Sequence, residues 1–226
     1  MMAAKGSMFS QETFRFFREL GRNNHKPWMD ENRERYRAVL VDPLRELLER
    51  LTPAARKLNP RFAVGGRVGE NFSRINRDIR FARDKSPYRT QMYLFFAEPE
   101  DGAQLYVGLS ADAVTCGFRA YSEGRTSPLV QIGRARGGEN TAWIERQKRR
   151  LAKYESYWYA TEKGDWAKHK GWPVKPENWK KFQGWIVRRK FAPAVATRVG
   201  FEREVARIFR EVYPLYPFTI SPAWKA

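Results

Sequence analysis

Three strand-like segments joined by very short connections occupy the middle of this 226-residue chain. The two connections, Pro99–Gly102 and Ser110–Asp112, have the composition of turns. Parallel strands need a long crossover between them, so connections this short require antiparallel pairing. The segments are rich in Tyr, Val, Phe and Leu, and they cover Gln91–Ala97, Gln104–Ser110 and Ala113–Tyr121. The middle of the chain therefore predicts a compact antiparallel sheet.

Helical patterns precede these strands. A long apolar stripe with three-and-four spacing runs from Tyr36 to Leu51 and indicates an amphipathic helix. Caps and prolines mark the expected boundaries. In chain order they are an N-cap at Ser10, a helix stop at Gly21, a polar loop at 23–28, an N-cap at Asp30, a kink or break at Pro43, a short helix restarting at Thr52-Pro53, and a weak strand at Arg61–Val64.

Helical patterns also follow the strands. The expected features are a cap with a first-turn proline at Ser127-Pro128, a basic amphipathic helix over 141–157, a looser region over 160–176, a helix opened by Pro176 that carries Trp179, Phe182 and Trp185, and a final helix with Phe201, Val205, Ile208 and Val212 that ends at Pro214. No internal repeat or low-complexity linker divides the chain. We therefore predict a single α+β domain over residues 1–226, with residues 1–8 as a loose leader.

Positive charge is abundant and unevenly distributed. The formal net charge is +18 and the isoelectric point is about 10.3. By segment, residues 67–90 contribute +4 and residues 134–226 contribute +12. Such a field attracts polyanions, chiefly nucleic acid, although a basic surface can also serve solubility alone.

Several protein classes are disfavoured by the sequence. The longest apolar run, Met92–Ala97, is too short for a membrane span. The lone Cys116 leaves no disulfide partner and fits a reducing cytoplasm. His25, His169 and Cys116 have no metal-site spacing, and the glycines at 65, 66 and 69 lack a phosphate-loop pattern, so we expect no metal and no cofactor.

The segment from Arg74 to Tyr88 is the best candidate for a functional site. Its five cations outnumber its two carboxylates and alternate with large apolar residues, which predicts a half-buried segment. We expect an extended entry through about Ile75, a turn in which Asp84 accepts backbone donors, and an extended exit at Ser86-Pro87. A buried guanidinium group needs a carboxylate or an anionic ligand as its partner.

Two interpretations of this segment stay open. In the first, a donor-rich basin binds a phosphate-bearing ligand or nucleic acid through Arg74, Arg77, Asp78, Arg80, Asp84, Lys85 and Tyr88. An alternative form of this interpretation is that the protein is a metal-independent phosphoester-processing enzyme, in which Lys85 or Tyr88 moves a proton. In the second, the same residues form an architectural Arg–Asp network without a ligand.

The segment also resembles a known family. The pattern Arg74-x-x-Arg77-Asp78-x-Arg80-Phe81, followed by Asp84-Lys85-x-x-Tyr88, is similar to the signature of the domain of unknown function 2461 family, which is mainly bacterial. The resemblance continues through Asn23-Asn24, Trp28, Asn32-Arg33-x-x-Tyr36 and Asp42-Pro43. It implies that these positions matter and implies no activity.

Tryptophans and lysines alternate over residues 158–185. Exposed rings beside lysines would suit single-stranded nucleic acid, which stacks its bases on aromatic side chains. Alternatively, the rings pack the core and only the lysines face solvent. Together these features predict a cytoplasmic protein that binds a phosphate-bearing ligand at Arg74–Tyr88 and has general affinity for nucleic acid in its C-terminal third.

Overall fold

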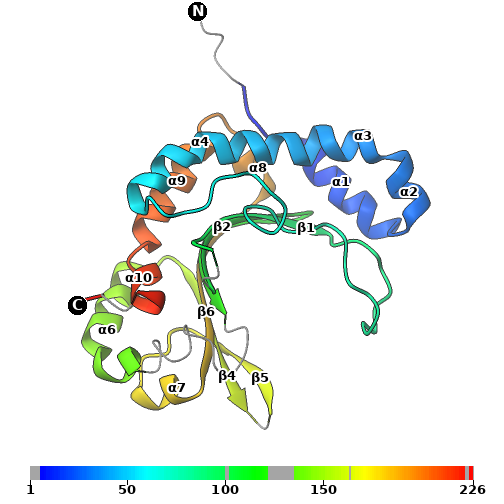
Figure 1. The fold of residues 1–226 in the computed structure, drawn as a ribbon. Coiled ribbons are helices and arrows are strands. Elements are labelled where there is room, and N and C mark those ends of the chain that lie inside the picture. Colours follow the sequence, from blue (N-terminus) through cyan, green and yellow to red (C-terminus); the bar gives the residue numbers. More distant parts are fainter. Residues whose placement is uncertain (1–5, 100–101, 122–134, 163, 222–223, 226) are drawn as a thin grey trace, which may run out of the picture. The chain divides into compact units, whose positions relative to one another are not determined.

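A six-stranded antiparallel sheet with helices from both ends of the chain forms the fold (Figure 1). The computed structural model describes residues 6–99, 102–121, 135–162, 164–221 and 224–225. The strands are β1 (Gln91–Phe96), β2 (Ala103–Ser110), β3 (Val114–Tyr121), β4 (Glu155–Glu162), β5 (Asp165–Lys170) and β6 (Phe182–Phe191), in the order β1-β2-β3-β6-β4-β5. The predicted α+β class and its three central strands are confirmed.

The helices lie before and after the central strands in the chain. They are α1 (Gln11–Arg22), α2 (Lys26–Glu31), α3 (Arg33–Tyr36), the π-helix η1 (Arg37–Val41), α4 (Asp42–Leu58), α6 (Thr141–Arg150), α7 (Pro176–Lys180), α8 (Pro193–Ala196), α9 (Phe201–Val212) and α10 (Leu215–Ile220). None of the described helices is both long and apolar enough to cross a membrane.

Two compact units share the chain. The first unit comprises Met1–Phe96, Val107–Thr115 and Phe191–Ala206, and the second comprises Ala97–Tyr106, Cys116–Lys190 and Arg207–Ala226. In the first unit, apolar side chains of α1 and α4 are buried, among them Phe14, Phe17, Leu20, Leu44, Leu47 and Leu51. In the second, aromatic rings dominate the core.

The predicted start of α1 is confirmed. The Ser10 hydroxyl accepts a hydrogen bond from the Glu12 amide, and the Thr13 hydroxyl accepts one from the Ser10 amide. These bonds satisfy donors that a helix start leaves unpaired. The apolar face that follows is buried, so the cap and the stripe together fix the position of α1.

A break at Pro43 is wrong, because η1 leads directly into α4. Pro43 lies in the first turn of α4 directly after η1, so its missing N–H leaves a carbonyl of the preceding turn without a backbone donor. The wider turn of η1 joins the Asp42 amide to the Arg37 carbonyl. Pro43 has no N–H to donate to the Val39 carbonyl four residues earlier. The Thr13 hydroxyl of α1 donates to this carbonyl instead, at 2.9 Å.

Three other expectations for the N-terminal half are wrong. His25, not Asp30, caps the second helix, and α2 begins inside the predicted polar loop. The helix does not restart at Thr52, since α4 continues through Pro53 on a buried apolar stripe. Arg61–Val64 forms no strand: the Asn59 side chain accepts the Arg61 amide and closes a turn there.

The C-terminal third contains more strand than predicted. The expected helix over 141–157 ends at Arg150, and β4 begins at Glu155. The looser region contains β5, and Trp185 lies in β6, not in a helix. The final helix is confirmed as α9, although α10 follows Pro214. The feature predicted at Ser127-Pro128 lies outside the described residues.

Most tryptophans of the 158–185 region belong to the core of the second unit. Trp158, Trp179 and Trp185 are buried. Trp185 meets Phe118 and Trp172 edge-on, and Trp179 meets Phe218 in the same way. The core interpretation is therefore confirmed for these three rings, whereas Trp166 is 47% exposed.

We predict that the Thr13 hydroxyl stabilises the first unit. Thr13→Val removes both the bond to the Val39 carbonyl and the capping bond, and it should lower the free energy of unfolding by about 1–3 kcal/mol. Urea denaturation followed by circular dichroism measures the change. Thr13→Ser keeps the hydroxyl and is the matched control. Equal stability of the Val variant and the wild type would contradict the assigned role.

Candidate functional site

The Arg74–Tyr88 segment is a two-armed loop that continues the pairing of β1 (Figure 1). Isolated antiparallel bridges join Phe72 to Leu94 and Asn76 to Tyr88. Between the arms, the Arg77 amide donates to the Pro87 carbonyl at 2.8 Å. The extended entry and the extended exit predicted from the sequence are thus both present.

Two asparagine side chains fix the base of this loop. The fully buried Asn71 amide donates to the carbonyls of Ala63 and Phe95 at 2.8 and 3.1 Å, and its oxygen accepts the Gly66 amide at 2.9 Å. Asn24 bonds both backbone groups of Tyr88, at 2.9 and 3.0 Å. Asn24 therefore holds the exit arm at Tyr88, whereas Asn71 holds the chain before the entry arm against β1.

Internal ion pairs and turn bonds organise the tip of the loop. Arg77 donates to Asp84 and to the Ser86 carbonyl, and Arg80 forms a two-point pair with Asp78. The Lys85 ammonium group donates to the carbonyls of residues 79 and 80. These contacts are the ones expected of an architectural network.

Hydrogen bonds from Ser86, followed by the bond from Arg77, lower the pKa of Asp84 to about 2. The pKa of Asp78 is also lowered, chiefly by its bonds from Arg80. The expected role of Asp84 as an acceptor for turn donors is confirmed by the Ser86 amide at 2.9 Å.

The prediction of a half-buried segment is wrong for the tip. Phe81 is 96% exposed, and the side chains of Arg80 and Asp84 are also largely exposed. The ion pair between Arg80 and Asp78 therefore lies in solvent. Burial begins at the base, where Tyr88 is buried.

The seven predicted site residues do not form one basin. Arg74 lines a pocket of about 570 Å³, whereas Arg77, Asp84 and Tyr88 line a separate hollow of about 280 Å³ with Asn24 and Arg89. Asp78, Arg80 and Lys85 line neither. Lys85 and Tyr88, the candidates for proton transfer, therefore do not meet in either hollow.

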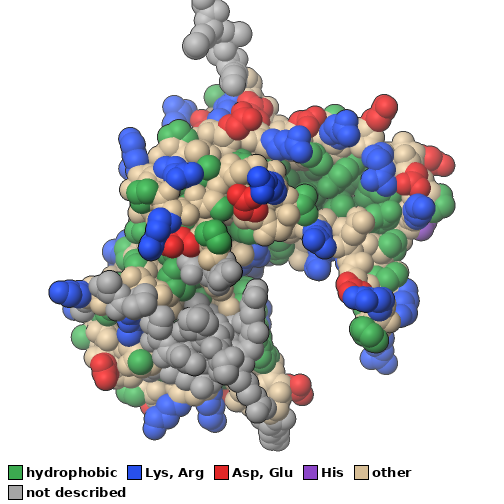
Figure 2. Space-filling model, viewed as in Figure 1, with side chains coloured by type: hydrophobic (Ala, Val, Ile, Leu, Met, Phe, Trp, Pro, Cys, Tyr) green, Lys and Arg blue, Asp and Glu red, His purple; other side chains and the backbone are tan. Residues whose placement is uncertain are grey.

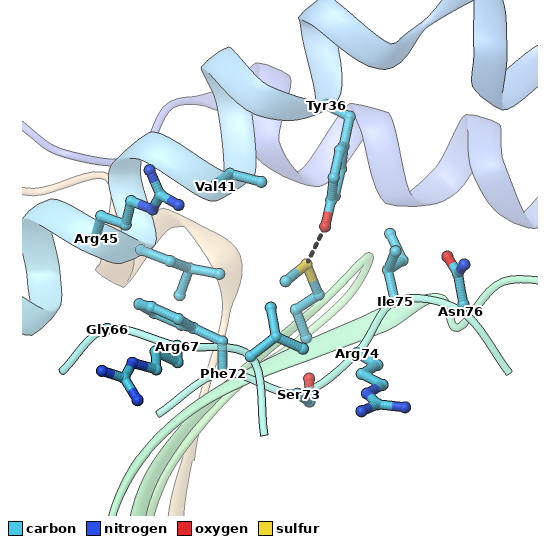
Figure 3. A pocket seen from close by; sticks show the side chains of 13 residues that line it. Tyr36, Val41, Arg45, Gly66, Arg67, Phe72, Ser73, Arg74, Ile75 and Asn76 are labelled. Atoms are coloured by element: carbon cyan, nitrogen blue, oxygen red, sulfur yellow. Dashed lines mark hydrogen bonds between the residues drawn. The ribbon is translucent and has the colours of Figure 1, made fainter. Parts of the chain in front are cut away.

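The larger pocket lies beside the base of the loop in the first unit (Figure 3). Its apolar lining includes the buried residues Leu44, Phe72 and Met92, together with Val41 and Ile75. Tyr36 reaches into the group from above and its hydroxyl lies 3.5 Å from the Met92 sulfur. Burial raises the pKa of Tyr36, which keeps this hydroxyl protonated and able to donate.

Among the described residues, three arginines and no carboxylate line this pocket. Arg45, Arg67 and Arg74 lie around its edge in Figure 3. Arg67 is 3.8 Å from Glu70, but Arg45 and Arg74 have no ion pair or hydrogen bond from their side chains within the described part of the chain. Figure 2 shows apolar surface below α3 and α4 with basic side chains around it. The charges of Arg45 and Arg74 are thus left without an ion-pair partner among the described residues.

Sequence reasoning found only Arg74 among the pocket residues. Tyr36, Arg45 and Arg67 come from α3, α4 and the loop before the arginine segment, and by residue number they precede Arg74 by 38, 29 and 7 positions. No local spacing connects them. Tyr36 belongs to the residues of the family resemblance, but nothing in the sequence around Arg45 or Arg67 indicated a role in a binding site.

The described residues contain no group of three or more His, Cys, Asp or Glu side chains that could hold a metal ion. His169 instead lies 3.1 Å from Glu162 and stacks on Trp158. Cys116 is buried as a free thiol. The groups that could contact a ligand in the pocket are therefore guanidinium, hydroxyl and apolar groups.

The fold and this pocket define an α+β protein with an arginine-edged, ligand-sized pocket. A family model described as "Conserved hypothetical protein (DUF2461)" matches residues 12–218, so the chain belongs to this family. The match confirms the predicted family and includes every residue that lines the larger pocket. A search of curated proteins gives no match to the chain.

We predict that the tip of the loop keeps its structure in moderate acid. Because the folded pKa of Asp84 is depressed to about 2, its bonds are intact above the ordinary carboxyl pKa near 3.8 and are lost as the pH falls through about 2. The amide resonance of Ser86, followed by NMR, should titrate with that low midpoint. Asp84→Asn removes the titrating group and should abolish the transition. A midpoint near 4 would show that these bonds do not form in solution.

Proposed function

We propose that the 570 Å³ pocket binds a small phosphate-bearing ligand that also carries an apolar group. Ligand pockets of proteins typically have volumes of about 300–1,000 Å³ and combine an apolar lining with a few polar groups. The pocket fits both criteria. All of its lining residues belong to the first unit.

The apolar lining supports the apolar part of the ligand. Leu44, Phe72 and Met92 are buried at the base of the pocket, and Val68 at its edge is 60% exposed. Transfer of apolar surface from water contributes about 25 cal/mol per Å², so a ring or short chain seated here would add appreciable affinity.

The arginines support the anionic part, and their unpaired state is the observation that carries the proposal. A guanidinium group matches two phosphate oxygens with parallel donors. Arg45 and Arg74 have no competing carboxylate among the residues lining the pocket. Among the described residues the Tyr36 hydroxyl is bonded only to the weak sulfur acceptor of Met92, so it is a further donor for a ligand oxygen.

The tip of the loop contributes differently. Arg77 and Arg80 are already bonded to Asp84 and Asp78, so we infer that they shape the loop and do not bind the ligand. Lys85 is engaged by turn carbonyls. The proposal therefore concerns binding and assigns no turnover.

We predict that a thermal-shift panel of nucleotides, sugar phosphates and aryl phosphates contains a compound that stabilises the protein saturably. Binding to the folded state alone raises stability with ligand concentration. Arg74→Gln and Arg45→Gln should each weaken the binding of that compound about 10- to 100-fold, as expected when a hydrogen bond between charged groups is lost. Isothermal titration calorimetry measures the change.

Arg83→Gln is the charge-matched control. Arg83 is an exposed arginine of the same segment and lines neither pocket. Its replacement should leave affinity within about 2-fold, because exposed charges at a distance are largely screened. Equal losses in the Arg83 and Arg74 variants, or a panel without any saturable shift, would refute binding at this pocket.

A further inference from the structure

We propose that one face of the sheet in the second unit binds single-stranded nucleic acid by stacking bases on its aromatic rings. This aromatic face consists of Tyr121 on β3, Tyr157 and Tyr159 on β4, Trp166, Lys168 and Lys170 on β5, and Arg188 on β6. It belongs wholly to the second unit and shares no residue with the phosphate-ligand pocket.

Strand register places these side chains together. Tyr157 pairs with Lys170, Tyr159 with Lys168, and Thr161 with Trp166. Directly paired residues of antiparallel strands point to the same face of the sheet. The alternate residues of β4, Ser156, Trp158 and Ala160, are buried, while Tyr157 and Tyr159 are only half-buried. One face of the β4–β5 hairpin is therefore core, and the other carries aromatic and basic groups.

The rings of this face form a partly exposed cluster. Trp166 stacks on Tyr121 with a centroid separation of 6.4 Å and an interplanar angle of 18°. Tyr159 lies 5.6 Å from Tyr121 and 6.0 Å from Trp166. Trp166 remains 47% exposed, an unusual amount for a ring of its size.

Gly184 makes room for the cluster. A Cβ atom at this position would lie 2.7 Å from the Ala120 carbonyl oxygen and 2.9 Å from the Tyr121 ring. Only a residue without a side chain permits so close an approach. Tyr121 can therefore lie over β6 beside Tyr159, with which Gly184 is paired in register.

The charge on this face is positive. The Lys168 ammonium group lies 4.0 Å from the centroid of the Tyr157 ring, and the Arg188 guanidinium lies 5.5 Å from it. Glu155 pairs with Arg188 at 3.1 Å. Lys168 and Lys170 have no carboxylate partner in the described part of the chain. Two cations thus flank the rings without compensation.

Single-stranded nucleic acid matches this combination. Every base has a π-face that can stack on an aromatic ring, and lysines beside the rings attract the phosphates. Bases in a duplex are stacked on one another and cannot reach Trp166 in this way. The +12 excess of residues 134–226, which include most of this face, adds long-range attraction. In the opposing interpretation, the rings only stabilise the hairpin through cross-strand packing.

The two interpretations differ in the response to replacing Trp166. The probe is a fluorescently labelled 12-nucleotide oligothymidylate, and its binding is followed by anisotropy. Trp166→Ala should weaken binding about 5- to 100-fold, in line with the loss of one base–ring stack. Trp166→Phe keeps a ring and should retain most of the affinity. Thermal denaturation shows whether both variants are folded. If the Trp166→Ala variant is unfolded, the affinity of the Trp166→Phe variant decides between the two interpretations.

Salt dependence tests the cations. Lys168→Gln should reduce the slope of log affinity against log salt concentration by about 0.7, the value for one phosphate contact with a single strand. Lys180→Gln is the matched control, because Lys180 is an exposed lysine on α7 and is not one of the residues of the aromatic face. Its slope should equal that of the wild type. Arg74→Gln should not change oligonucleotide binding, which separates this proposal from the pocket.

Three results would overturn the proposal. One is equal affinity of the wild type and a folded Trp166→Ala variant. Another is loss of affinity in Trp166→Phe as large as in Trp166→Ala, which would point to hairpin packing. The third is a 12-base-pair duplex that binds as tightly as the single strand and is equally sensitive to Trp166→Ala. The last two patterns exclude base stacking as the source of affinity.

Discussion

The buried side chain of Asn71 is the interaction on which the pocket depends. Its side-chain amide forms hydrogen bonds to three separate backbone groups, at Ala63, Gly66 and Phe95. A buried amide is expensive unless its hydrogen bonds are formed, so the cost of misplacing it is high. Asn71 thereby ties the loop before the arginine segment to β1, and pocket residues 66–68 and 72–76 follow from that placement.

The same backbone arrangement divides the cations of the segment into two groups. At the tip, Arg77 and Arg80 are close in sequence to Asp84 and Asp78, and short-range pairs form. At the base, Arg74 lies beside an apolar surface with no carboxylate lining the pocket. A net charge calculated for the whole segment cannot separate these groups. It is the position of each guanidinium relative to the fold that leaves some of them available to a ligand.

Much of the fold could be predicted from local patterns. Short turns predicted the pairing of β1, β2 and β3, a cap with an apolar stripe predicted α1, and an apolar stripe ending before Pro214 predicted α9. The strands β4 to β6 were missed because a segment dense in tryptophan and lysine satisfies both helical and extended patterns. The alternation of Ser156, Trp158 and Ala160 was the signal for β4, but it becomes decisive only when β6 is known to pair beside it in the sheet.

The candidate site was less predictable, because it depends on contacts between distant segments. Arg74 stood out as a cation among apolar residues, whereas Arg45 and Arg67 are ordinary surface arginines by sequence. Asn71 and Asn24 also gave no local sign of their role, since their partners lie 5 to 24 and 64 residues away. In contrast, the turn bond of Asp84 spans two residues and was predicted correctly.

Arginine side-chain NMR tests the unpaired state of the pocket cations most directly. The Nε–H resonances of Arg45 and Arg74, assigned by substitution, are followed while phenyl phosphate is added to the wild-type protein. If the pocket cations are available and the tip cations are not, both resonances shift saturably with one dissociation constant, while those of Arg77 and Arg80 stay in place. Shifts confined to Arg77 and Arg80, or equal and unsaturable shifts at all four, would contradict a binding pocket at the base of the loop.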